Sequence, residues 1–167
     1  MAQNSNYVTV DGEFDSLEKR SFLTIDDYKL ESQTVILRID INSSINPENG
    51  DLLDDTRIKR HSATVKELSE MNAKVIILAH QSRPGKLDFV NLENHGKRMS
   101  QIINKEIIFV DDLYGDKAIN QIKKLENGDI LLLDNVRFDK EEIELNQFVN
   151  DNFEIQNNSE MVKKLSP

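Results

Sequence analysis

The stretch Thr34-Val-Ile-Leu-Arg-Ile39 decides the fold of this chain, because a short run of β-branched and apolar residues is typical of a buried strand. Three further apolar runs of similar length follow at residues 74–79, 106–110 and 129–133. Strands that are apolar throughout, without polar alternation, are typical of parallel sheets covered on both faces. The sequence therefore predicts a buried parallel sheet of four strands.

Amphipathic helices are predicted between these strands. Apolar residues recur at helical spacing over about residues 55–71, and Asp54 or Asp55 can cap the start of this helix. Helices are also predicted over about residues 91–104 and 116–125. Because crossovers between parallel strands are right-handed, helices in this order can cover both faces of the sheet. The predicted fold class is α/β, a three-layer α/β/α, doubly wound, Rossmann-like parallel sheet.

The composition limits the kind of protein. The chain has 167 residues, of which 38% are hydrophobic, so it can bury the core of one domain. It has no cysteine, which excludes disulfides and thiolate metal sites. It has no apolar run long enough for a membrane span and no signal-peptide pattern, and its net charge of −9 disfavours nucleic acid and anionic lipid as partners. A soluble, cytoplasmic protein is predicted, in which a local cluster of cations must hold any anionic ligand.

The ends of the chain differ from its centre. Residues 1–21 are polar and have no apolar period, so a flexible N-terminal extension is predicted there. Residues 22–167 are predicted to form one domain. The last helical pattern of this domain, at residues 159–165, leads into no further strand. The sheet is therefore expected to be incomplete at its C-terminal edge.

Polar residues gather where the predicted strands end. Ligands of open parallel sheets bind beyond the carboxyl ends of the strands, so a site is expected there. Four of the seven arginines lie at strand ends or at a helix start, and a guanidinium group can bind two oxygens of a phosphate or carboxylate at once. The candidates are Arg38, Asp40, Asn42, Arg57, His80, Arg83 and Arg137. Together they predict a small ligand that carries both anionic groups and hydroxyls.

Each candidate also has a structural interpretation. Arg38 is equally compatible with an ion pair inside the fold, and Asp40 and Asn42 with a turn at the strand end. His80 is compatible with a packed core histidine. The other polar residues are interpreted as structural: His61 and His95 as helix residues, Asp111, Asp112 and Asp134 as helix caps, and residues 139–144 as a solvated acidic face. No dinucleotide fingerprint, P-loop, nucleophile elbow or zinc pattern is present in the sequence.

Four segments resemble, in order, motifs of the N-terminal domain of phosphoglycerate kinase, most of all in its archaeal branch. Arg38-Ile-Asp-Ile-Asn42 resembles the family's R-x-D-x-N, and Asp54-Asp-Thr-Arg-Ile58 resembles its T-R-I helix start. Ala79-His-Gln-Ser-Arg-Pro84 resembles S-H-L-G-R-P, and Gly128-Asp-Ile-Leu-Leu-Leu-Asp-Asn-Val-Arg-Phe138 resembles G-x-x-L-L-L-E-N-V-R-F. The resemblance covers roughly residues 22–167.

The resemblance implies an enzyme of glycolysis and gluconeogenesis that transfers a phosphoryl group between 1,3-bisphosphoglycerate and ADP, giving 3-phosphoglycerate and ATP. At the matching positions, Asp40 and Asn42 would contact the glycerate end of the substrate. His80, Arg83 and Arg137 would hold its phosphate. Such a set suits phosphoryl transfer, because this chemistry depends mainly on positioning and on stabilisation of charge.

The resemblance also implies that Arg57 is the catalytic residue, which would stabilise the transferring phosphoryl group. Two departures from the family pattern stand close to the candidate residues. Ser82 replaces the family's glycine between the histidine and the arginine, and Ser43-Ser44 replaces a common proline. A side chain at residue 82 is expected to hinder close approach of the backbone to a phosphate.

The sequence contains no match to the family's nucleotide domain. The resemblance implies that Mg-ATP or Mg-ADP is bound by that C-terminal domain, so neither a cofactor site nor a metal site is expected in this chain. The chain is expected to be an incomplete enzyme, inactive alone, and the complete enzyme is expected to be monomeric. A freestanding module that binds phosphorylated hydroxy acids without catalysis is the alternative. A separately encoded nucleotide domain is a third hypothesis, in which activity is restored by a partner.

Overall fold

The computed structural model describes residues 23–144 and 153–165, so the predicted extension at residues 1–21 lies outside the described residues. Its centre is a sheet in which every neighbouring pair of strands is parallel. The strands lie in the order β1 (Thr34–Arg38), β2 (Lys74–Ala79), β4 (Ile130–Asn135) and β3 (Ile108–Val110). The prediction of four parallel strands is confirmed.

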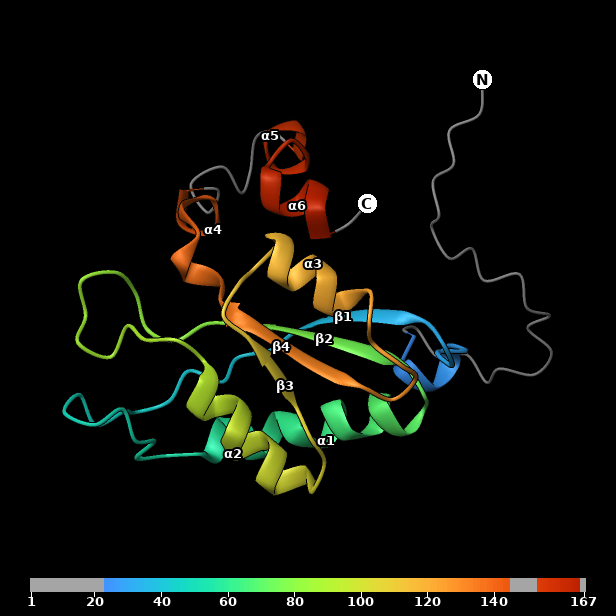
Figure 1. The fold of residues 1–167 in the computed structure, drawn as a ribbon, viewed down its shortest axis with the longest axis horizontal. Coiled ribbons are helices and arrows are strands. Elements are labelled where there is room, and N and C mark those ends of the chain that lie inside the picture. Colours follow the sequence, from blue (N-terminus) through green and yellow to red (C-terminus); the bar gives the residue numbers. More distant parts are fainter. Residues whose placement is uncertain (1–22, 145–152, 166–167) are drawn as a thin grey trace.

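Helices cover the two faces of this sheet and make the three predicted layers. Figure 1 shows α1 (Thr56–Glu70) and α2 (Glu93–Ile103) on one face, and α3 (Asp116–Ile122) on the other. The short elements are η1 (Ile25–Asp27), η2 (Val136–Phe138), α4 (Lys140–Glu144), α5 (Phe153–Asn157) and α6 (Glu160–Leu165). None of the helices in the described parts of the chain is long and apolar enough to cross a membrane.

The core consists of two apolar layers, one on each face of the sheet. Val75 and Ile77 of β2 belong to the layer under α1 and α2, whereas Ile76 between them belongs to the layer under α3. Strand β4 alternates in the same way, and all of its residues are buried. This alternation explains why the central strands are apolar throughout, since side chains on both faces meet a helix layer.

The edge strand β1 corrects one expectation. The sequence predicts a strand that is buried on both faces, but Thr34, Ile36 and Arg38 are exposed. Val35 and Leu37 pack against the layer under α1 and α2, so only one face of β1 is covered. The physical reason is position, because β1 lies at the edge of the sheet next to β2 alone among the described strands. Ile36 is 42% exposed as a result.

Glycine within α2 allows the helix to approach the sheet closely. A Cβ atom on Gly96 would lie 3.1 Å from Cδ2 of Leu132 on β4, which is tighter than an ordinary contact. Glycine is unfavourable inside helices, so this position is better explained by packing than by helix propensity. The neighbouring residue, His95, is fully buried.

The chain leaves β2 and β4 toward opposite faces of the sheet. After β2 it leads into α2, on the face of α1, and after β4 it leads to α4, on the side of α3 (Figure 1). Since β2 and β4 are neighbours, their carboxyl ends form the topological switch point of the sheet. Ligands of open α/β sheets bind at such points. The fold therefore directs attention to residues 80–83 and 135–138.

Candidate ligand-binding site

Asp40 and Arg57 meet just beyond β1. Arg57 lies in the first turn of α1, and its Nη1 donates a hydrogen bond to Oδ2 of Asp40. The other carboxylate oxygen of Asp40 accepts the backbone N–H of Asn42 at 3.1 Å. Partial burial alone would raise the pKa of Asp40, but the hydrogen bonds from Asn42 and Arg57 outweigh it and lower that pKa. The carboxylate stays charged at neutral pH, and half of each side chain remains exposed.

Asn42 connects this loop to the segment that follows β2. Its Oδ1 accepts the backbone N–H of Ser82 at 2.8 Å, so the amide nitrogen of Asn42 is the group left to donate to a ligand. Ser82 has a left-handed backbone with φ of 55°, a conformation that favours glycine. Its hydroxyl donates to Oδ1 of Asp88 at 2.6 Å, which ties the loop back on itself.

His80 lies among the charged candidates. Burial lowers its pKa below the ordinary value of 6.5, and the nearby Arg137 lowers it further, whereas Asp40 acts in the opposite direction. His80 is therefore a neutral imidazole at pH 7, and its ring nitrogens can bond to a phosphate or hydroxyl. An anion bound beside it would raise its pKa, because a negative charge favours the protonated ring.

Arg137 joins the end of β4 to the same loop. Its Nη1 donates to the backbone carbonyl of Ser82 at 2.5 Å. The buried side chain of Asn135 supports this arrangement, since its Oδ1 accepts the N–H of Arg137 at 3.2 Å and its Nδ2 donates to the carbonyl of Gln81 at 2.8 Å. Asn135 is not among the residues predicted from the sequence, although its place two residues before the arginine is a visible signal.

Arg38 has a carboxylate partner. Both of its terminal nitrogens donate to the two carboxylate oxygens of Glu142 on α4, so the structural interpretation of Arg38 is supported.

The expectation that residues 139–144 form a solvated acidic face is wrong. Asp139 accepts the hydroxyl of Tyr114, and Glu141 accepts two backbone N–H groups at the start of α6. The physical reason is that α4 lies against neighbouring elements, where its carboxylates find donors.

Arg83 is the candidate that the structure does not join to the others. It lies in the exposed turn after His80, where its carbonyl accepts the N–H of Lys86 at 3.2 Å. Among the described residues, no hydrogen bond or ion pair of its side chain connects it to the site. Hydrogen bonds and close charges do bring together Asp40, Asn42, Arg57, His80 and Arg137.

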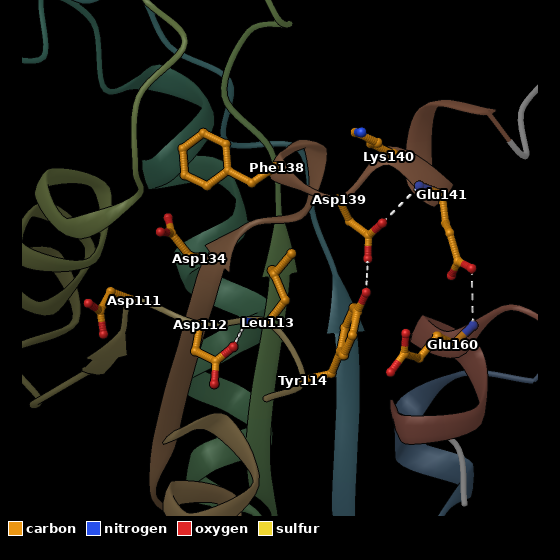
Figure 2. A pocket seen from close by; sticks show the side chains of 10 residues that line it. All are labelled: Asp111, Asp112, Leu113, Tyr114, Asp134, Phe138, Asp139, Lys140, Glu141 and Glu160. Atoms are coloured by element: carbon orange, nitrogen blue, oxygen red, sulfur yellow. Dashed lines mark hydrogen bonds between the residues drawn. The ribbon is translucent and has the colours of Figure 1, made fainter. Parts of the chain in front are cut away.

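A separate pocket of about 520 Å³ lies beyond β3 and β4 and is strongly acidic (Figure 2). Six of its ten lining residues are carboxylates, which makes it unsuitable for a phosphorylated ligand. Two of them have structural roles: Asp112 accepts N–H groups of Gly115 and Ala118 at the start of α3, and Asp134 accepts those of Leu92 and Asn135. Asp112 is thus a helix cap, as predicted. In the described parts of the chain, no histidine or carboxylate group is arranged to hold a metal ion.

The fold and these side chains define a doubly wound α/β domain with arginine, histidine, asparagine and aspartate at its switch point. A sequence model of one family, phosphoglycerate kinase, matches residues 25–167. The chain belongs to the phosphoglycerate kinase family. The resemblance inferred from the sequence motifs is confirmed.

Individual relatives agree with this assignment. Phosphoglycerate kinase of Methanobacterium bryantii is 53% identical over 122 residues, which cover 73% of this chain and 30% of that protein. The enzyme of Methanococcus maripaludis is 51% identical over 148 residues, or 87% of this chain and 36% of its own length. The crystal structure of phosphoglycerate kinase from Pyrococcus horikoshii OT3 superposes with a TM-score of 0.78 at 31% identity, over 86% of this chain and 34% of that one. The chain therefore spans about a third of the length of its relatives.

Proposed function

We propose that this chain is the part of a phosphoglycerate kinase that binds 3-phosphoglycerate and 1,3-bisphosphoglycerate. The observation that carries the proposal is the meeting of Asp40, Asn42, His80 and Arg137 at the switch point of the sheet. These side chains combine hydroxyl-binding groups with donors for an oxyanion, as a phosphorylated hydroxy acid requires. The reaction moves a phosphoryl group from the acyl phosphate of 1,3-bisphosphoglycerate to ADP, and it is reversible.

The resemblance to the family motifs supplies the proposed roles, and the hydrogen bonds of the site are compatible with them. Asp40 accepts from the hydroxyl of the glycerate, and the amide nitrogen of Asn42 donates to its oxygens. His80, Arg83 and Arg137 hold the phosphate, where Arg137 is already aligned by Ser82 and Asn135. Arg83 would have to reach the phosphate from its exposed turn. Arg57 is kept beside the glycerate end by Asp40 and faces the charge that develops on the transferring group.

The nucleotide is assigned to a different part of the enzyme. Mg-ATP and Mg-ADP would bind a C-terminal domain of the kind that makes up the remaining length of the relatives, and this chain would be inactive without it. The magnesium nucleotide supplies the phosphoryl acceptor or donor and neutralises its charge. We further propose a cytoplasmic location and a monomeric complete enzyme.

Calorimetric titration of the chain with 3-phosphoglycerate tests the binding role. We expect saturable binding, and we expect Arg83→Ala to weaken it by about tenfold because a charge-assisted hydrogen bond is lost. Arg83 suits the test since its side chain has no bond to the described fold that a substitution would break. Lys66→Ala is the control, because Lys66 pairs with Glu70 on the exposed face of α1. A folded wild-type chain that gives no binding, or equal weakening by both substitutions, overturns the proposal.

The catalytic role of Arg57 needs the nucleotide domain. We expect the chain to transfer phosphoryl groups only when that domain is supplied, and Arg57→Ala to lower turnover more than the affinity for 3-phosphoglycerate. The reason is that a contact made to the transition state changes kcat, whereas a contact made equally to the ground state changes KM. Steady-state rates at varied 3-phosphoglycerate separate the two effects. Unchanged turnover of the variant contradicts the assignment.

A further inference from the structure

The side chain of Gln81 is buried and pairs with the backbone of a neighbouring loop. Its Nε2 donates to the carbonyl of Ser43 at 2.9 Å, and its Oε1 accepts the N–H of the same residue at 2.9 Å. One side-chain amide thus satisfies both the backbone N–H and the backbone carbonyl of Ser43, as a neighbouring strand would. The regular pairing of β1 with β2 ends at Arg38 and Leu78, so Gln81 extends the connection past the strand ends.

A buried histidine bonds to the oxygen of this amide. Nε2 of His95 lies 3.0 Å from Oε1 of Gln81. Because the carbonyl of Ser43 requires the amide nitrogen of Gln81 on its own side, the atom facing His95 is an oxygen, and His95 must donate through Nε2–H. His95 and Gln81 have no exposed surface, so water does not compete for these bonds.

The loop held in this way carries two of the candidate ligand-binding residues. Asp40 and Asn42 stand three residues and one residue before Ser43, whose hydroxyl also donates to the carbonyl of Ile41 at 2.8 Å. On the other side, Gln81 lies between His80 and Ser82, and its own carbonyl accepts Nδ2 of Asn135. The side chain of Gln81 therefore connects the residues after β1 with those after β2 and β4.

We propose that Gln81, with its amide oxygen held by His95, is a positioning residue that sets Asp40 and Asn42 against His80 and Arg137 for binding of the phosphorylated ligand. The inference rests on the proposed function, because it concerns the same site. The residues proposed to bind the ligand would touch it directly, whereas Gln81 is enclosed by the fold and acts only through the loop. A residue of this kind affects affinity by geometry, since small displacements of contacting groups weaken binding strongly.

Two substitutions and their combination separate positioning from simple stability. Gln81→Leu removes both bonds to Ser43 and leaves the buried Nε2–H of His95 without an acceptor, which destabilises the fold. In Gln81→Leu/His95→Leu the orphaned donor is also gone, so the free energy of unfolding partly recovers. The bonds to Ser43 are not restored. We therefore expect affinity for 3-phosphoglycerate to fall by about tenfold or more in Gln81→Leu and to stay low in the double variant.

Two further variants serve as controls. His95→Gln keeps an N–H donor for Oε1 of Gln81 and is expected to bind like the wild type. Ser69→Ala removes a buried bond to the carbonyl of Gly128, and another from Lys105, away from the carboxyl ends of the strands. It is expected to lower stability without changing affinity.

Amide hydrogen exchange provides a readout that needs no ligand. Ser43 is expected to exchange at least about tenfold faster in Gln81→Leu and in the double variant, because its N–H has lost its acceptor. Unchanged exchange of Ser43, or affinity that recovers together with stability in the double variant, overturns the inference. If Ser43 exchanges faster but the folded wild type does not bind 3-phosphoglycerate, the proposed function fails and the positioning role fails with it, while the bond from Gln81 to Ser43 is confirmed.

Discussion

Ser82 shows how a single residue can keep a backbone shape that usually needs glycine. Its φ of 55° places it in the left-handed region, where a side chain costs about 1–2 kcal/mol. The hydroxyl compensates by donating to Asp88. The N–H of Ser82 is also already bound to Asn42, so its backbone is committed to holding the site.

Substitution at this residue separates strain from hydrogen bonding. Ser82→Ala keeps the strain and loses the bond to Asp88, so we expect a loss of about 1 kcal/mol in the free energy of unfolding. Ser82→Gly loses the same bond but removes the strain, so it should be close to wild type and more stable than the alanine variant. Urea denaturation measures both. An alanine variant as stable as the glycine variant contradicts this account.

His95 makes stability depend on pH. Burial lowers its pKa from 6.5 to about 4. Between these values the unfolded chain binds a proton that the folded chain does not, so the free energy of unfolding decreases as pH falls, by about 1.4 kcal/mol per pH unit from this group. Above the unfolded value the contribution is complete, and below the folded value nothing more is lost.

The pH dependence is tested with His95→Gln, which cannot titrate in this range. Between pH 7 and pH 4.5 we expect the wild type to lose about 2 kcal/mol more stability than the variant. Carboxylates contribute equally to both proteins, so the difference isolates His95. Parallel curves for the two proteins in chemical denaturation contradict the expectation.

The residues of the site were predictable to different degrees. Asp40, Asn42, His80 and Arg137 stand directly after strands, and the parallel sheet brings such positions together. Gln81 was missed because glutamine carries no motif of its own. A signal was nevertheless present, since Gln81 continues the alternation of Ile77 and Ala79, which face the layer under α1 and α2.

At the scale of elements, α4 brings a carboxylate to a cation beside the site. Glu142 pairs with Arg38, and both contribute to the electrostatic environment of His80. The sequence could not show this pair, because the two residues are 104 positions apart. The helices and central strands were predictable from local periodicity, whereas contacts between the strand edge and a distant helix depend on tertiary packing.

Neutralising the carboxylate of Glu142 should favour binding of an anionic ligand. We expect Glu142→Gln to raise the affinity for 3-phosphoglycerate by about threefold at low salt and by less at high salt, because one negative charge is removed and Arg38 loses its competing partner. Calorimetry at two salt concentrations measures the effect. Glu144→Gln, an exposed change of the same type on α4, is the control. Equal affinities for the two variants rule out a specific role for the pair.

At the scale of the whole molecule, the net charge of −9 is unevenly distributed. Carboxylates concentrate in the pocket beyond β3 and β4, while arginines and His80 gather where β1, β2 and β4 end. The composition alone predicted that any anion must be held locally, and the candidate site is where cations gather. The acidic side would repel the same ligand, so the two regions together favour binding at the switch point.

The uncovered edge of the sheet leads to a prediction about association. Among the described residues no strand pairs with the outer edge of β1, and Ile36 is exposed on its open face. Open edges with apolar side chains favour pairing between chains, and lysine opposes it because its charge would be buried. We expect light scattering to show concentration-dependent association of this chain, and Ile36→Lys to reduce it without changing the affinity for 3-phosphoglycerate. Leu53→Lys removes a more exposed apolar side chain outside the sheet and should leave association unchanged. If both lysine variants reduce association equally, general hydrophobicity is the cause and the edge of β1 is not.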